Sequence, residues 1–137
     1  MGDHKSHASS VVETFNNDDW DGASRFFGAS TYNELGTQRS LKGTDIVDAL
    51  KGWKTAMPDV KGTITGAEEV GNQVILEVSW HGTQTGPLAT PEGEIPPSNK
   101  SHTTPSAWIL DYEGDALVES RHYFDMLTIL QQIGAAS

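Results

Sequence analysis

The sequence predicts an α+β fold in which helices come first and a run of antiparallel strands follows. Apolar residues recur at helical spacing before residue 57, and strand-like alternation extends from residue 60 to residue 124. A short helical pattern then closes the chain. A curved, mostly antiparallel sheet wrapped around one long helix would form a cone whose open end is a natural pocket.

The residues before the predicted sheet indicate helices and one short strand. Residues 1–8 are polar, and we expect them to be disordered. Two short N-terminal helices are expected next, broken near Asn16, with Asp18 or Asp19 capping the second. Residues 30–38 are β-prone between turn residues and predict a brief strand.

The clearest helix lies between Thr44, a favourable N-cap, and Pro58, which cannot continue a helix. Alternating strands account for most of residues 60–124. Residues 87–105 are an exception, because their prolines cannot donate to a ladder and predict an irregular hairpin connection or a sheet edge. A short C-terminal helix is expected at residues 126–133.

Composition excludes several classes of protein. The 137 residues suit one domain with its own core, so we expect a single domain over residues 1–137. With 9 basic against 19 acidic residues, a nucleic-acid partner is not expected, because phosphate binding needs clustered Lys and Arg. The absence of Cys excludes disulfides and thiolate metal sites, and no metal-ligand spacing occurs. Without a signal peptide or an apolar run near the roughly 20 residues of a membrane span, we expect a cytoplasmic protein with no membrane partner.

Asp125 is the principal candidate for chemistry, because it stands at the junction of the last strand and the last helix. It could simply cap the helix, since Asp is among the best N-caps. It could instead face a pocket and act as a general acid/base. The two roles compete, because capping hydrogen bonds lower the pKa of a carboxyl and desolvation raises it.

Other polar residues are candidates for substrate contact. Tyr123 shares a strand face with Asp125 and could bind an enolate oxygen, or it could be a core residue with its hydroxyl at the edge. His122 falls on the opposite face, which favours a dimer or sheet-face role. His102 is the best candidate for a second titratable group in the pocket. Alternatively, it is an exposed loop histidine. Asn33 could orient a carbonyl or water, or stabilise a turn.

The tryptophans Trp53, Trp80 and Trp108 are most simply core residues. At least one of them could line a cavity for a flat, partly aromatic ligand, because indole offers a large apolar area with one donor.

Four stretches in order resemble the SnoaL-like polyketide cyclase family of the nuclear transport factor 2-like superfamily. They are "GTDIVDALKGWKTAMPDV", "HGTQTGP", "ATPEGEIP" and "ALVESRHYFDMLTILQQIG". The resemblance implies a cone-shaped α+β barrel with a hydrophobic pocket, usually a homodimer through the outer sheet face. It also implies an aldol ring closure without metal or cofactor, in which the aspartate of a Tyr-x-Asp motif is the general acid/base; this role maps onto Asp125. Gln84 stands where the family often has His.

The sequence therefore predicts a cofactor-free cyclase or isomerase-type enzyme for a small, apolar, polyketide-like carbonyl compound. Asp125 would take and return a proton, while Tyr123, Gln84 or Asn33 holds the enolate oxygen.

Two alternatives stay open. A limonene-epoxide-hydrolase-like activity needs two carboxylates bridged by an arginine, so Arg39 or Arg121 would have to reach Asp125 and a second acid such as Asp111. In a non-catalytic ligand-binding or dimerisation module, Asp125 would be only a cap.

Overall fold

A computed structural model of the chain describes residues 3–136. These residues form four helices, α1 (Asp3–Asn16), α2 (Trp20–Phe27), α3 (Thr44–Ala56) and α4 (Met126–Gln132). A six-stranded sheet has the order β2-β1-β8-β7-β4-β3, with bounds β1 (Thr31–Glu34), β2 (Arg39–Lys42), β3 (Lys61–Val70), β4 (Gln73–Thr83), β7 (Ser101–Glu113) and β8 (Ala116–Phe124). A separate hairpin pairs β5 (Leu88–Thr90) with β6 (Gly93–Ile95).

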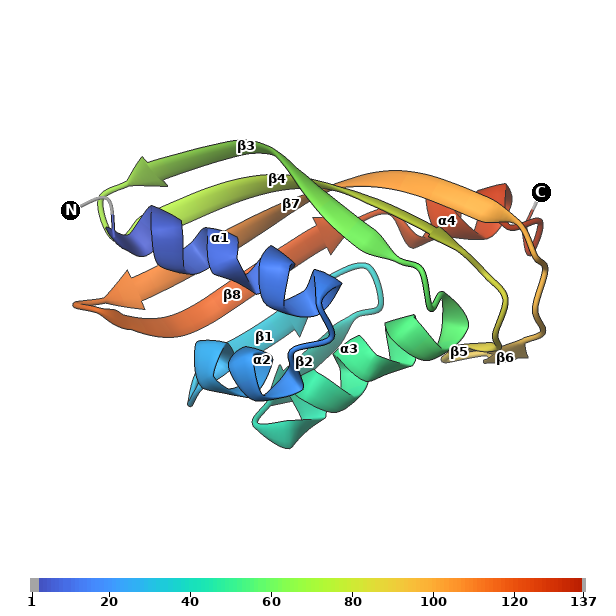
Figure 1. Cartoon of the computed structure of the whole chain (residues 1–137), viewed down its shortest axis with the longest axis horizontal. Helices are drawn as coiled ribbons and strands as arrows, with labels where there is room; N and C mark the ends of the chain where they lie inside the picture. Colours follow the sequence, from blue (N-terminus) through green and yellow to red (C-terminus); the bar gives the residue numbers. More distant parts are fainter. Residues whose placement is uncertain (1–2, 137) are drawn as a thin grey trace.

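The predicted α+β fold class is confirmed. Neighbouring strands of the large sheet are antiparallel except for β1 and β8, which run parallel. Figure 1 shows this sheet bending over α1 and α3, with α4 placed beyond the end of β8. Helix α1 packs on β3 and β4, whereas α3 contacts β2 and β5. The inward side chains of the sheet and the apolar faces of the helices form one hydrophobic core.

The first two helices are separated where the sequence predicts. Asn16 ends α1, and its side chain both accepts from Gly62 N (2.8 Å) and donates to Gly62 O (2.9 Å). Asp19 caps α2 by accepting from Gly22 N at 2.9 Å, which confirms the predicted cap. The expected cap at Thr44 is wrong, because Gly43 holds the N-cap position and Thr44 is the first helical residue.

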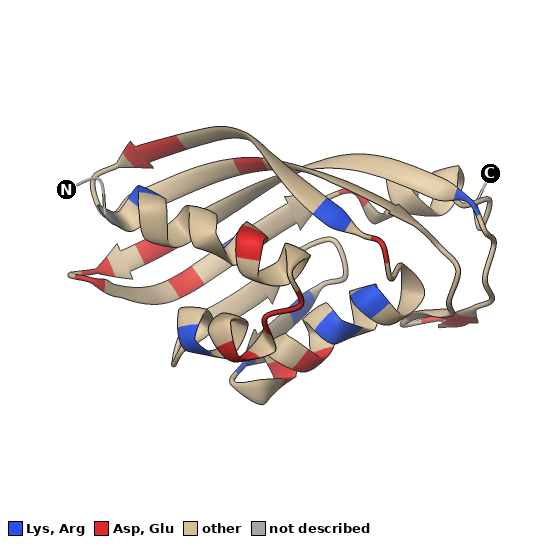
Figure 2. Ribbon diagram, in the orientation of Figure 1, with Lys and Arg blue, Asp and Glu red and all other residues tan. Residues whose placement is uncertain are grey.

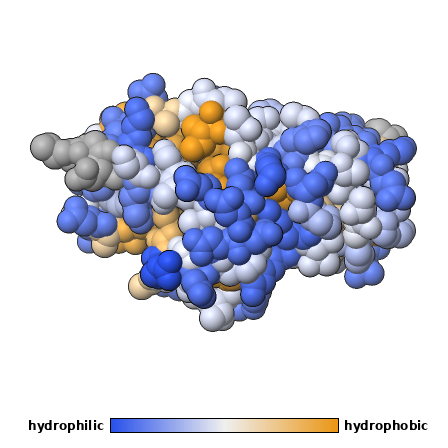
Figure 3. Space-filling model, viewed as in Figure 1, coloured by the Kyte–Doolittle hydropathy of each residue, from blue (hydrophilic) through white to orange (hydrophobic). Residues whose placement is uncertain are grey.

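Charges along α3 complement the helix dipole. Acidic residues stand in its first half and lysines in its second, with Asp45 in the first turn and Lys54 in the last (Figure 2). Figure 3 shows that this face of the molecule is mostly hydrophilic, with hydrophobic residues exposed in only a few small areas. Within residues 3–136, no helix is both long and apolar enough to cross a bilayer.

Residues 3–8, expected to be disordered, begin α1 instead. The polar N-terminus folds because its histidine rings pack as aromatic groups. His4 stacks on Tyr112 with ring centroids 4.3 Å apart, and His7 stacks on Phe26 at 4.5 Å. His7 Nδ1 also lies 2.7 Å from the Tyr112 hydroxyl. The same expectation for residues 1–2 lies outside the described residues.

The expected irregular segment ends earlier than predicted, because β7 begins at Ser101. Pro105 is tolerated inside β7 since β8 pairs only from Ser106 onward, so no strand lies where the missing N–H would point. Beyond that point the side-chain amide of Gln132 replaces the absent strand. It accepts from Thr103 N (2.8 Å) and donates to Thr103 O (3.0 Å), which fixes α4 against the edge of β7.

Candidate functional site

An apolar cavity of about 60 Å³ lies between α3 and the concave face of the sheet. Its walls are mainly aromatic, and the aromatic carbon surface comes from Phe15, Trp53, Trp80, Trp108 and Phe124. The polar side chains on its walls are Tyr32, Glu34, His102, Thr104 and His122. The alternation of β1, β4, β7 and β8 brings these groups together, because every second residue of a strand faces the same side.

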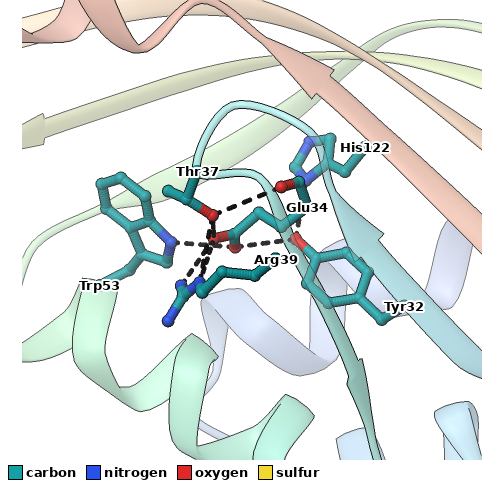
Figure 4. A network of polar contacts seen from close by, with 6 residues as sticks. All are labelled: Tyr32, Glu34, Thr37, Arg39, Trp53 and His122. Carbon is teal, nitrogen blue, oxygen red and sulfur yellow. Dashed lines mark hydrogen bonds and ion pairs between the residues drawn. The ribbon is translucent and has the colours of Figure 1, made fainter. Parts of the chain in front are cut away.

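The Glu34 carboxylate is the centre of a network of polar contacts (Figure 4). Its side chain is 1% exposed, which would be costly without partners. Oε1 accepts from Arg39 (Nη2, 2.6 Å) and from the Thr37 hydroxyl, and Oε2 accepts from Trp53 Nε1 (3.1 Å) and the Tyr32 hydroxyl (3.0 Å). The short β1–β2 hairpin supplies the arginine from the next strand, and α3 supplies the indole.

His122 adjoins this network on the next strand. Its Nδ1 lies 3.1 Å from the Tyr32 hydroxyl. Burial lowers the pKa of His122 to about 4, and the charge of Glu34 opposes this only in part. The imidazole is therefore neutral near pH 7. Burial, and next the charge of Glu34, raise the pKa of Tyr32 well above its usual value, so the phenol keeps its proton.

The other edge of the His122 ring meets β4 and β7. Nε2 lies 3.1 Å from Ser106 Oγ and 3.3 Å from Trp80 Nε1. Trp80 Nε1 also donates to Ser106 Oγ at 2.9 Å. Trp108 stacks on the imidazole with centroids 4.2 Å apart and a 10° angle between planes. The ring is thus fixed from both edges and one face.

His102 lies at the wall of the cavity, where the sequence expects a second titratable pocket group. It is buried, with Nδ1 2.9 Å from Thr104 Oγ1. Burial, and then the neighbouring His81, lower its pKa. The tryptophans Trp53, Trp80 and Trp108 also line the cavity.

Asp125 lies outside the residues that line the cavity. Its side chain is exposed and caps α4, accepting from Leu127 N (3.0 Å) and from the Thr128 hydroxyl (2.7 Å). The capping interpretation therefore describes its contacts. Its predicted role in proton transfer stays a prediction.

The face assignment of the last strand is wrong for His122, which points into the molecule rather than to the outer sheet face. Since side chains alternate, Tyr123 points outward and is 43% exposed. Asn33 also faces away from the cavity, donating to Glu119 Oε2 (2.9 Å) and Ser120 O (3.1 Å). The substrate contacts expected of Tyr123 and Asn33 stay predictions.

Gln84 is fully buried and organises the chain after β4. Its Nε2 donates to Gly86 O and Pro96 O, each at 3.1 Å, and its Oε1 accepts from Ser98 N at 3.2 Å. Both ends of the amide are therefore occupied by the segment that carries the β5–β6 hairpin. Its expected contact with an enolate stays a prediction.

Sequence reasoning missed Tyr32, Glu34 and Ser106 as site residues and turned His122 to the wrong face. A strand of four residues has too few alternations to show which face is buried, so its pattern does not distinguish Asn33 from its inward-facing neighbours. The usable signal was the Tyr-x-Glu spacing, which places two polar side chains on one face.

Arginine–carboxylate pairs lie in two separate places. Arg39 contacts Glu34 at the cavity, whereas Arg121 donates to Asp111 (2.5 Å) on the outer side of the sheet. Glu34 is the sole carboxylate among the described residues that line the cavity. Within residues 3–136, no group of three His, Asp or Glu side chains is arranged to hold a metal ion.

Comparisons with solved structures show the same fold. AclR, a candidate hydroxylase from Streptomyces galilaeus, has a TM-score of 0.82 at 17% identity, covering 98% of this chain and 82% of that one. IdmH, a candidate polyketide cyclase from Streptomyces antibioticus, has a TM-score of 0.79 at 16% identity, with 94% and 96% covered. A protein of ketosteroid isomerase-like fold from Catenulispora acidiphila has a TM-score of 0.74 at 21% identity, with 93% and 92% covered.

A search of curated protein sequences returns no significant match. The family model of the SnoaL-like polyketide cyclases matches residues 6–133, which include α2, α3, α4 and every strand. The chain belongs to the SnoaL-like polyketide cyclase family.

Proposed function

We propose that this protein is a cofactor-free enzyme that closes a ring in, or isomerises, a small apolar polyketide-like carbonyl compound. Family membership supports a cyclase-type function. The observation that carries the proposal is His122, a buried neutral imidazole at the wall of an apolar, aromatic cavity. The apolar, aromatic lining suits a flat apolar substrate, and the imidazole supplies a group that can take and return a proton.

The chemistry needs one proton acceptor. His122 takes a proton from the carbon next to a carbonyl group, which leaves an enolate and an imidazolium ion. The enolate carbon then attacks a second carbonyl of the same molecule, and the new alkoxide takes the proton back from His122. Isomerisation differs only in returning the proton to another carbon. No electrons are gained or lost overall.

The surroundings of His122 suit a particular kind of substrate. A base with a pKa of about 4 abstracts a proton readily only from an acidic carbon, such as one flanked by two carbonyl groups. The negative charge of Glu34, reached through Tyr32, offsets the positive charge that develops on the imidazole. Trp80 Nε1, at 3.3 Å from His122 Nε2, can donate to an enolate oxygen once its N–H leaves Ser106 Oγ, to which it donates at 2.9 Å in the unliganded protein.

Asp125 is the rival proton acceptor. It is exposed and engaged as a cap, so its direct use would require the first turn of α4 to rearrange. The critical experiment therefore compares variants of His122 and Asp125. Asp125→Asn is the suitable variant, because Asn keeps the capping capacity of Asp and removes its basicity.

The test uses aromatic compounds that carry a β-keto ester and a second carbonyl within ring-closing distance. New rings are detected by NMR and by a mass that is unchanged or reduced by one water. We expect His122→Gln to lower kcat by about 100-fold or more, the usual contribution of general acid–base catalysis. Asp125→Asn should retain most of the turnover.

Other outcomes would overturn parts of the proposal. Loss of turnover in Asp125→Asn with full turnover in His122→Gln would make Asp125 the acid/base. If the wild-type protein binds these compounds, seen as quenched tryptophan fluorescence, but closes no ring, a binding module replaces the enzyme. Hydrolysis of an apolar epoxide, assayed alongside these compounds, would favour the hydrolase alternative.

A further inference from the structure

We propose that Glu34 is a positioning residue that acts through Tyr32 to hold neutral His122 with its proton on Nδ1. The lone pair is then on Nε2, and this nitrogen is the one that accepts the substrate proton. The tautomer follows from the contacts of a buried, neutral imidazole, whereas the part played by Nε2 in catalysis rests on the proposed function.

The first step concerns the direction of the Tyr32–Glu34 hydrogen bond. Glu34 is ion-paired with Arg39 at 2.6 Å, and an ionised carboxylate can only accept. The Tyr32 hydroxyl, 3.0 Å from Glu34 Oε2, must therefore donate its proton to that oxygen. Trp53 Nε1 donates to the same oxygen at 3.1 Å. Oε2 therefore acts as an acceptor and has no proton that it could donate to Tyr32.

The second step passes this direction on to His122. Tyr32 has one hydroxyl proton, so once that proton is donated to Glu34 its oxygen can only accept from His122 Nδ1, 3.1 Å away. A neutral imidazole has one N–H, and burial keeps His122 neutral near pH 7. The N–H is therefore on Nδ1 and the lone pair on Nε2.

The contacts of Nε2 support the same tautomer independently. Trp80 Nε1 can only donate, and it lies 3.3 Å from His122 Nε2. A proton on Nε2 would put two N–H groups face to face. The Ser106 hydroxyl, 3.1 Å from Nε2, donates its one proton to Val78 O at 2.9 Å, so Trp80 Nε1 is the donor that a lone pair on Nε2 receives.

The groups that face His122 come from three other strands and from its own strand, where Phe124 packs edge-to-face on the imidazole. Tyr32 and, behind it, Glu34 come from β1, Trp80 comes from β4, and Ser106 and Trp108 come from β7. Glu34 is the single charged group among them. A substitution that stops Glu34 from accepting the Tyr32 hydrogen bond is thus the most direct way to change the tautomer without altering the His122 ring.

Glu34→Gln should reverse the tautomer. Arg39 and Thr37 both donate to the Oε1 position, so the amide oxygen of Gln is expected there. The NH₂ group then faces Tyr32, and Trp53 Nε1 loses its acceptor. Tyr32 must then accept from the amide and donate to His122 Nδ1. The imidazole proton moves to Nε2, where Ser106 Oγ can accept it.

The experiment is ¹⁵N NMR of histidine-labelled full-length protein at pH 7 without substrate, in which two-bond N–H correlations identify each tautomer. We expect Nδ1–H for His122 in the wild type and Nε2–H in Glu34→Gln. Thr37→Val is the matched control, because it removes another donor to Glu34 but leaves the Tyr32 contact, and it should keep Nδ1–H. If Glu34→Gln does not fold, Tyr32→Phe cuts the same link and should give a mixture of tautomers.

The proposal is overturned if wild-type His122 is protonated on Nε2, or if both Glu34→Gln and Tyr32→Phe keep the wild-type tautomer. A kinetic readout separates positioning from simple support of the fold: Glu34→Gln should lower kcat with little change in KM. Failure of the proposed function looks different, because Nδ1–H would then be observed in a protein that closes no ring.

Discussion

The buried neutral imidazole makes a quantitative prediction about stability against pH. His122 has a pKa of about 4 in the folded protein and 6.5 as a free side chain. The unfolded chain therefore binds this proton more readily than the folded one. It follows that the stabilisation is complete above pH 6.5 and is lost as the pH falls toward 4.

The magnitude follows from the size of the shift. Each pKa unit is worth about 1.4 kcal/mol, so the shift from 6.5 to about 4 corresponds to about 3 kcal/mol in total. By linkage, about 2 kcal/mol of this is lost between pH 7 and pH 5. The pKa values of His7 and His102 are lowered too, so they weaken the fold in the same direction.

The assay is urea unfolding followed by tryptophan fluorescence at pH 7 and pH 5. His122→Gln is the control, because it removes this titration while leaving His7 and His102 in place. We expect the wild type to lose about 2 kcal/mol more unfolding free energy than the variant over this interval. Equal losses in the two proteins would refute the reasoning. If the variant does not fold, NMR titration should find His122 unprotonated in the wild type at pH 5, and a protonated ring there would refute it equally.

Three further predictions concern the segments around the cavity, each measured as unfolding free energy in urea. Asp125→Ala should lose about 1 kcal/mol through the missing N-cap, while Asp125→Asn loses a few tenths; equal effects would contradict the capping role. Gln132→Ala should cost about 1 kcal/mol and speed hydrogen exchange at the Thr103 amide. An amide that stays protected in the variant would contradict this contact. Gly86→Ala should cost about 1–3 kcal/mol, because its Cβ would lie 2.1 Å from Thr55 O; an unchanged stability would show that this loop shifts freely.

Much of the fold could be predicted because its signals are local. The cap at Asp19 and the end of α3 ahead of Pro58 each depend on a few neighbouring residues. The predicted element bounds are wrong where residues distant in the sequence determine the local structure. Pro105 lies within β7 because β8 has already ended there, and Gln132 supplies the missing partner from α4. No local pattern reports either fact.

The candidate site was harder to predict for the same reason. Alternation along β8 gives the relative faces of His122 and Tyr123, but not which face is buried. If Asp125 is assumed to face the pocket, Tyr123 is assigned to the inner face of β8 and His122 to the outer face, which is the reverse of the structure. The pairing of Tyr32 and Glu34 with His122 joins the first strand to the last, and it depends on the parallel β1–β8 contact that element order does not reveal.

A crystal structure of the protein with a non-reacting aromatic enol bound would test the role of His122 most directly. We expect the enol oxygen and its adjacent carbon to lie in the cavity beside His122 Nε2, within reach of Trp80 Nε1. Asp125 should still accept from Leu127 N, as it does without ligand. A reactive carbon seated against the Asp125 carboxylate, with that cap broken, would show that Asp125 and not His122 is the proton acceptor.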